Sequence, residues 1–159
     1  MSFYQQTGVL VFGSRLRRLS ETFLADINRI YRHKGIRFDA AWFPVFYMLS
    51  NKESVSIRDI SIELETSHSA ASQLISKLQE KGLIRTVPDK EDSRKKLVTF
   101  TPKGQKLLQQ VKPVWEALQH AMNDLLLENV HSKQLMQAIH EMEKALLESP
   151  LFDRIEKKL

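Results

Sequence analysis

The chain has 159 residues, 42% of them hydrophobic, which suits one domain with a packed core and argues against global disorder. It contains no cysteine, and this excludes disulfides, thiolate metal sites and cysteine-based redox sensing. The net charge of +5 is a mild basic excess that is compatible with nucleic acid but identifies no partner by itself.

The N-terminal part is predicted to be helical. Apolar residues recur there at helical spacing: Leu16, Leu19, Phe23, Ile27 and Ile30. They indicate one long helix over residues 6–33, with Gly35 as its stop. A second helix is expected after Asp39, where Pro44 either bends the helix or marks its first turn. The long helix cannot bury its whole apolar stripe in a monomer, so we expect it to pair with the C-terminal helices of its own chain and of a second copy.

The centre of the sequence has the pattern of a helix-turn-helix. Val55-Ser56 is long enough only for a bridging strand, and Ser56 followed by Asp59 resembles a capping box that starts a short helix. A second helix is expected over residues 68–81, ended by Gly82, after a turn of three to four residues.

The second of these helices has two distinct faces. Its core face is apolar and consists of Ala71, Leu74, Ile75 and Leu78. Its other face carries no acid and consists of His68, Ser69, Ser72, Gln73 and Ser76. Such a face can enter a DNA major groove and read bases, for which we select His68, Ser69, Ser72 and Gln73, with Ser67 and Lys77 on the phosphate backbone. The alternative is an ordinary solvated helix face.

Two strands, residues 83–87 and 96–100, are predicted to follow as a hairpin, or wing, around a charged loop. Thr101 then caps a long helix that has Pro102 in its first turn, and a last helix covers residues 132–148. The predicted fold is mostly α with a small β-hairpin wing, a winged helix-turn-helix flanked by dimerisation helices. Its three regions are 1–38 (N-terminal dimerisation helix), 39–104 (DNA-binding region) and 105–159 (C-terminal dimerisation helices).

Residues 49–104 resemble the MarR family of winged-helix transcriptional regulators. The resemblance is carried by "LETSHSAASQLISKLQEKGLI" and by the wing pattern of "DKEDSRKKLVTFTPKG", namely Asp92, Arg94, Leu97, Thr101 and Gly104. It implies a homodimer that binds a pseudo-palindromic double-stranded operator, as a repressor, in the bacterial cytoplasm at the nucleoid.

The resemblance also implies roles for the wing. Arg94 would enter a minor groove, whose negative potential suits arginine, while Lys95 and Lys96 hold the DNA backbone. Asp92 would shape the wing by orienting a basic partner, either Arg85 or Arg94. The alternative is a solvated charged turn.

Many members of this family sense small aromatic or anionic molecules. The candidates for such an effector pocket are Phe12, Arg15, Trp42, Phe43 and Phe46. Aromatic residues at helical spacing are, however, more often part of a core.

No catalytic, cofactor or metal site is expected, because the five histidines lack carboxylate or cysteine partners at ligand spacing. A small enzyme with an unusual site therefore has no support in the sequence. The main alternative to DNA binding is a winged helix used for protein–protein assembly.

Overall fold

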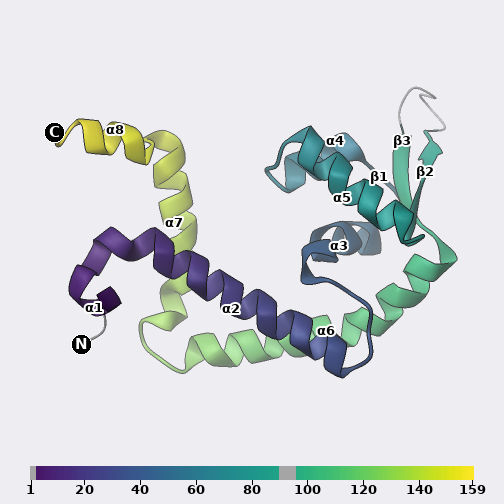
Figure 1. Cartoon of the computed structure of the whole chain (residues 1–159), viewed down its shortest axis with the longest axis horizontal. Coiled ribbons are helices and arrows are strands. Elements are labelled where there is room, and N and C mark those ends of the chain that lie inside the picture. The colour runs from purple at the N-terminus through teal and green to yellow at the C-terminus, as the bar shows by residue number, and fades with distance from the viewer. Residues whose placement is uncertain (1–2, 90–95) are drawn as a thin grey trace. The chain divides into compact units, whose positions relative to one another are not determined.

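The computed structural model describes residues 3–89 and 96–159, and the chain divides into two compact units, Met1–Val114 and Trp115–Leu159. The first unit contains, in chain order, α1 (Phe3–Thr7), the 3-10 turn η1 (Gly8–Val11), α2 (Phe12–His33), η2 (Ala40–Trp42), α3 (Phe43–Asn51), β1 (Val55–Ser56), α4 (Ile57–Glu63), α5 (His68–Glu80), β2 (Ile84–Pro88) and β3 (Lys96–Phe100). The helix α6 (Pro102–Leu127) contributes residues to both units. Figure 1 shows α4 and α5 side by side, with the β2–β3 hairpin beside the C-terminal end of α5.

The N-terminal helix differs from the continuous segment that the sequence predicts. Its first residues form α1 and η1, and only Phe12–His33 make up the long helix α2. The backbone of Gly8 has a φ of +60°, a left-handed conformation that an α-helix does not contain, and this explains the interruption. The end of the helix is as predicted, since Gly35 has a φ of +68° directly after it.

The start of α3 decides between the two roles considered for Pro44. Pro44 lies in the first turn of α3, where its missing N–H costs no hydrogen bond. Before it, the Asp39 carboxylate accepts a hydrogen bond from the backbone N–H of Ala41 at 2.9 Å and thereby caps η2. The Asn28 side chain accepts from the N–H of Ala40 at 2.8 Å, which fastens this turn to α2.

Both helices of the helix-turn-helix begin at serine caps. The Ser56 hydroxyl accepts from the N–H of Asp59 at 3.0 Å at the start of α4, as the sequence predicts. The Ser67 hydroxyl accepts from the N–H of Ala70 at 3.1 Å at the start of α5. After α5, Gly82 has a φ of +67° and ends the helix.

The wing belongs to a three-stranded antiparallel sheet of order β1–β3–β2. Arg85 pairs with Thr99, and Pro88 pairs with Lys96 at the far end of the ladder. On the other edge of β3, Ser56 pairs with Leu97, so the bridging strand joins the hairpin. This pairing places the beginning of α4 next to the beginning of β3.

The core of the first unit is built around aromatic rings. Phe38 makes edge contacts with Tyr31 and Phe46, at centroid distances of 4.9 and 5.0 Å. Phe46 in turn contacts Phe100 of β3 at 4.9 Å, which connects α3 to the sheet. Such edge-to-face pairs add to the stabilisation from apolar burial.

The junction between the wing and α6 is packed without spare space. The Thr101 hydroxyl donates to the carbonyl of Gly82 at 2.6 Å and accepts from the N–H of Gly104 at 3.1 Å, as a helix cap does. A β-carbon at Gly104 would overlap the backbone carbonyl of Leu83. Glycine is therefore required here by close backbone approach.

The second unit continues α6 and adds η3 (Ser132–Gln134), α7 (Leu135–Glu148) and α8 (Leu151–Glu156). The guanidinium of Arg154 donates to the carbonyls of Ser149 and Ala145, each at 2.7 Å, which fixes α8 to the end of α7. Neither helix contains a buried residue. Among the helices of the described residues, none has the length and apolarity that crossing a membrane requires.

Candidate nucleic-acid interface

The helix α5 presents the two faces that its sequence predicts. Ala71, Ile75 and Leu78 are buried, and the cap at Ser67 fixes the first turn of the helix. The side chains of the opposite face are exposed, except for the half-buried Ser72: His68, Ser69, Gln73 and Ser76. The face contains no carboxylate, so nothing on it repels DNA.

The predicted base-reading residues are not equally available. His68 Nδ1 lies 3.4 Å from Ser72 Oγ, so these two side chains adjoin each other. Ser67, predicted to contact the phosphate backbone, uses its hydroxyl oxygen to accept the capping hydrogen bond of α5. Ser69 and Gln73 are exposed, and the amide of glutamine can form two hydrogen bonds with an adenine edge. Gln73 is therefore the strongest candidate for base readout on this face.

Lys77 lies near the C-terminal end of α5 and is exposed. It lines a hollow of about 610 Å³ together with Trp42 and Lys81. The ammonium of Lys81 lies 5.4 Å from the centre of the Trp42 ring, a cation–π contact. The sequence did not indicate this contact, because residues 42 and 81 lie far apart in the chain.

The wing residues are only partly described. Asp92, Arg94 and Lys95 lie outside the described residues, and their predicted roles stay predictions. Lys96 is exposed at the described end of β3, facing Pro88. Arg85 is exposed at the base of the hairpin, where it lines a hollow of about 620 Å³ with Lys52 and Gln105.

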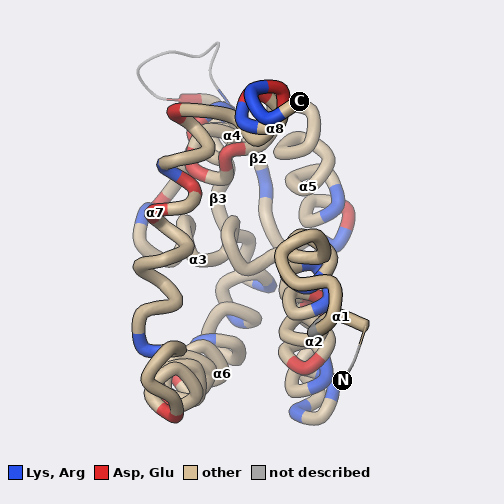
Figure 2. Tube along the Cα trace, turned by 90° about the vertical axis from the view of Figure 1, so that its left-hand side faces the viewer, with Lys and Arg blue, Asp and Glu red and all other residues tan. Residues whose placement is uncertain are grey.

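Charged residues of both signs are interspersed along the chain. Figure 2 shows both basic and acidic positions on α2 and on α7. Residues 55–104 contain nine basic and seven acidic residues, so the DNA-binding argument rests on local placement and not on bulk charge.

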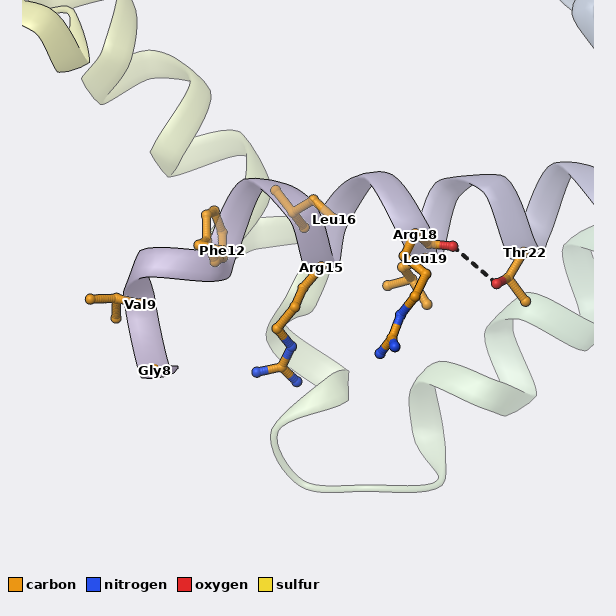
Figure 3. A pocket seen from close by; sticks show the side chains of 8 residues that line it. All are labelled: Gly8, Val9, Phe12, Arg15, Leu16, Arg18, Leu19 and Thr22. Carbon is orange, nitrogen blue, oxygen red and sulfur yellow. Dashed lines mark hydrogen bonds between the residues drawn. The ribbon is translucent and has the colours of Figure 1, made fainter. Parts of the chain in front are cut away.

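The candidate effector residues have different surroundings in the described part of the chain. Phe12 and Arg15 line a hollow of about 780 Å³ along α2, together with Arg18 and Leu19. Figure 3 shows the guanidinium groups of Arg15 and Arg18 extending from the same side of the helix. Arg18 also lies 4.3 Å from the centre of the Tyr4 ring. The sequence places Arg18 on the same helix face as Arg15, three residues later, although Arg18 is not among the predicted effector residues.

The three aromatic candidates of the second helical region have separate surroundings. Trp42 lies beside Lys81, as described above. Phe43 stacks on Tyr47 at 5.4 Å, and Phe46 is fully buried in the core. Neighbouring positions in sequence thus point to different faces of a helix.

The described residues were also inspected for clusters of metal-ligating side chains. No group of three or more His, Cys, Asp or Glu side chains there could hold a metal ion.

The sequence and the fold were compared with those of known proteins. Residues 38–95 match the model of the MarR family. The HTH-type transcriptional regulator YdgG of Bacillus subtilis (strain 168) is 37% identical over 67 residues, which are 40% of this chain and 44% of that protein. The chain thus matches less than half the length of this curated relative.

Solved structures show the same fold over most of the chain. The MepR–DNA complex of S. aureus matches with a TM-score of 0.72 at 18% identity, covering 85% of this chain and 97% of that one. Bordetella bronchiseptica BpsR, whose DNA binding is regulated by 6-hydroxynicotinic acid, matches with a TM-score of 0.68 at 22% identity, covering 90% and 98%. By their names, these proteins are a transcriptional regulator and two DNA-binding proteins. The winged helix-turn-helix of this chain is thus similar to the MarR family over residues 38–95.

Proposed function

We propose that this protein is a sequence-specific transcriptional regulator that binds double-stranded DNA. The observation that carries the proposal is the exposed, acid-free face of α5 directly beside a wing. A polar helix face of this kind fits the major groove, and a wing can reach the adjacent backbone and minor groove. The DNA-bound state of MepR supports the proposal.

The proposed DNA contacts are of two kinds, base readout in the grooves and contacts with the phosphate backbone. Gln73 and Ser69, with His68 and Ser72, read base edges, and Arg94 reads the minor groove. The holding contacts go to phosphates, which position the protein without selecting sequence. They come from Ser67, Lys77, Lys95 and Lys96.

The regulator acts as a homodimer on a pseudo-palindromic operator. Support comes from apolar side chains that neither unit buries. On α2, Leu16, Leu19 and Leu24 are each more than 40% exposed. On α7 and α8 the exposed set is larger: Leu135, Met136, Met142, Leu146, Leu147, Leu151, Phe152 and Ile155. Surfaces of this extent are typical of protein interfaces, and a second copy covers both at once.

In this proposal the protein is a repressor, and a small aromatic or anionic effector releases it from DNA. BpsR supports it, since an aromatic carboxylic acid regulates that protein's DNA binding. Of the candidate residues, Phe12 and Arg15 lie together on α2 and provide an aromatic ring and a cation. The site of action is the nucleoid in the bacterial cytoplasm.

A selection of genomic fragments by the purified protein at about 0.15 M salt tests the proposal. We expect enrichment of one inverted repeat whose half-sites lie about one helical turn apart. Retention that ignores sequence would contradict specific regulation. If no DNA is retained at any salt concentration, the winged helix serves protein–protein assembly instead.

A further inference from the structure

A hollow of about 730 Å³ lies between the start of α4, the start of α5 and the base of the wing loop. Side chains from all three places line it: Arg58, Asp59, Ile62, His68, Asp89 and Lys96. The hollow thus joins the first residue of α5 to the first residue of β3. These are the two elements that the proposed function puts against DNA.

The sheet register brings the start of α4 to the end of β3 that contains Lys96. Ser56 pairs with Leu97 in antiparallel orientation, so the chain that continues beyond Ser56 runs toward Lys96. The backbone at Arg58 is fixed as well, because its carbonyl accepts a hydrogen bond from the Ser61 hydroxyl at 2.7 Å. Both cations are exposed and line the same hollow.

We propose that this hollow receives a phosphate of the DNA backbone, held between Arg58 and Lys96, and that Asp59 limits the strength of the contact. The inference rests on the proposed function. The planar guanidinium of Arg58 matches the geometry of two phosphate oxygens, and Lys96 adds a second positive charge. A carboxylate beside them repels the same phosphate and prevents the hollow from binding any duplex too strongly.

The acids in the lining favour a backbone phosphate over a free anion. Asp59 and Asp89 offset the formal charges of Arg58 and Lys96, so the hollow attracts a small anion in solution only weakly. A phosphate that belongs to a duplex already held by α5 arrives at a high effective concentration. It therefore gains from Arg58 despite the nearby carboxylates.

Two substitutions with opposite expected signs test the proposal. Binding of the duplex retained in the fragment selection is measured by fluorescence anisotropy from about 0.05 to about 0.3 M salt. Arg58→Gln should weaken binding about tenfold at the middle of this range and reduce the slope of log affinity against log salt by about 1. Asp59→Asn removes the repulsion and should strengthen binding about threefold.

An exposed arginine away from the hollow serves as the control. Arg29 lies on α2 and is exposed, so Arg29→Gln should leave both affinity and salt slope unchanged. Thermal unfolding followed by circular dichroism verifies that each variant is folded.

The outcomes separate this inference from the proposed function. An unchanged salt slope in folded Arg58→Gln, or no gain from Asp59→Asn, would overturn the phosphate site while the chain remains a DNA-binding regulator. Absence of any binding by the unsubstituted protein would overturn the proposed function and the phosphate site together. Opposite shifts in the two variants, with a reduced slope in the first, support the site.

Discussion

The two units of this chain differ in how much of their apolar surface they bury. All residues that are buried in the described part of the chain lie between Tyr31 and Val111, within the first unit. In the second unit, α7 and α8 bury none of theirs, and Phe152 is 71% exposed. The first unit therefore has a core of its own, whereas the helices of the second need another surface to become stable.

Substitution of one phenylalanine in each unit should give the largest contrast. Phe46→Ala removes a fully buried ring and should lower the free energy of unfolding by about 3–5 kcal/mol. Phe152→Ala should cost less than about 0.5 kcal/mol in dilute protein and more as the protein concentration rises. Urea unfolding at two protein concentrations measures both. Equal costs in dilute solution would mean that the second unit has an independent core.

A pair of glycines tests how tightly the first unit is packed. Gly104→Ala should lower the free energy of unfolding by about 1–3 kcal/mol, because its β-carbon meets the Leu83 carbonyl. Gly13→Ala, in the open on α2, should be neutral or stabilising by up to about 1 kcal/mol. Thermal melts of the two variants measure the difference. An unchanged free energy of unfolding in Gly104→Ala would show that the backbone at the junction of the wing and α6 can move to accept a β-carbon.

The exposed face of α5 should affect binding without affecting stability. Gln73→Ala should lose about 1–3 kcal/mol of binding free energy for the operator and little for unrelated DNA. Its melting temperature should match that of Gln110→Ala, an exposed glutamine on α6 that serves as the control. Anisotropy with both duplexes provides the measurement. Equal losses on the two duplexes would assign Gln73 to the backbone and not to the bases.

The smallest expected effect concerns the start of α5. Ser67→Ala removes the hydroxyl that accepts from the N–H of Ala70 and should destabilise the protein by about 1 kcal/mol. Ser69→Ala, two residues later and exposed, should stay within about 0.5 kcal/mol of the unsubstituted protein. Denaturant unfolding curves of the two variants measure their stabilities. Identical midpoints would show that water satisfies the N–H of Ala70 without a loss of stability.

Features set by neighbouring residues were predictable from the sequence. Gly35 and Gly82 end helices, Ser56 and Thr101 cap them, and Ala71 faces the core, because each of these depends on a few adjacent positions.

Features set by distant contacts were not predictable in the same way. The pairing of β1 with β3, which brings the start of α4 and the start of β3 to one hollow, depends on residues about 40 apart in the chain. The separation of Phe46 from Phe12 follows from packing, since aromatic character alone does not distinguish a core ring from a pocket ring. The roles of Asp92, Arg94 and Lys95 stay predictions.

The end of α5 is anchored to the first turn of α6, and this has a mechanical consequence. The ammonium of Lys103 donates to the carbonyl of Lys81 at 2.6 Å, beside the bond from Thr101 to Gly82. Ser69 lies about 18 Å along the helix from Lys81, at about 1.5 Å per residue. A tilt of about 10° at the anchored end therefore moves Ser69 by about 3 Å, close to the spacing of about 3.4 Å between stacked base pairs. Because the distance from the anchor to Ser69 is large, even a small tilt at the anchored end corresponds to a displacement of the reading face that is comparable to one base step.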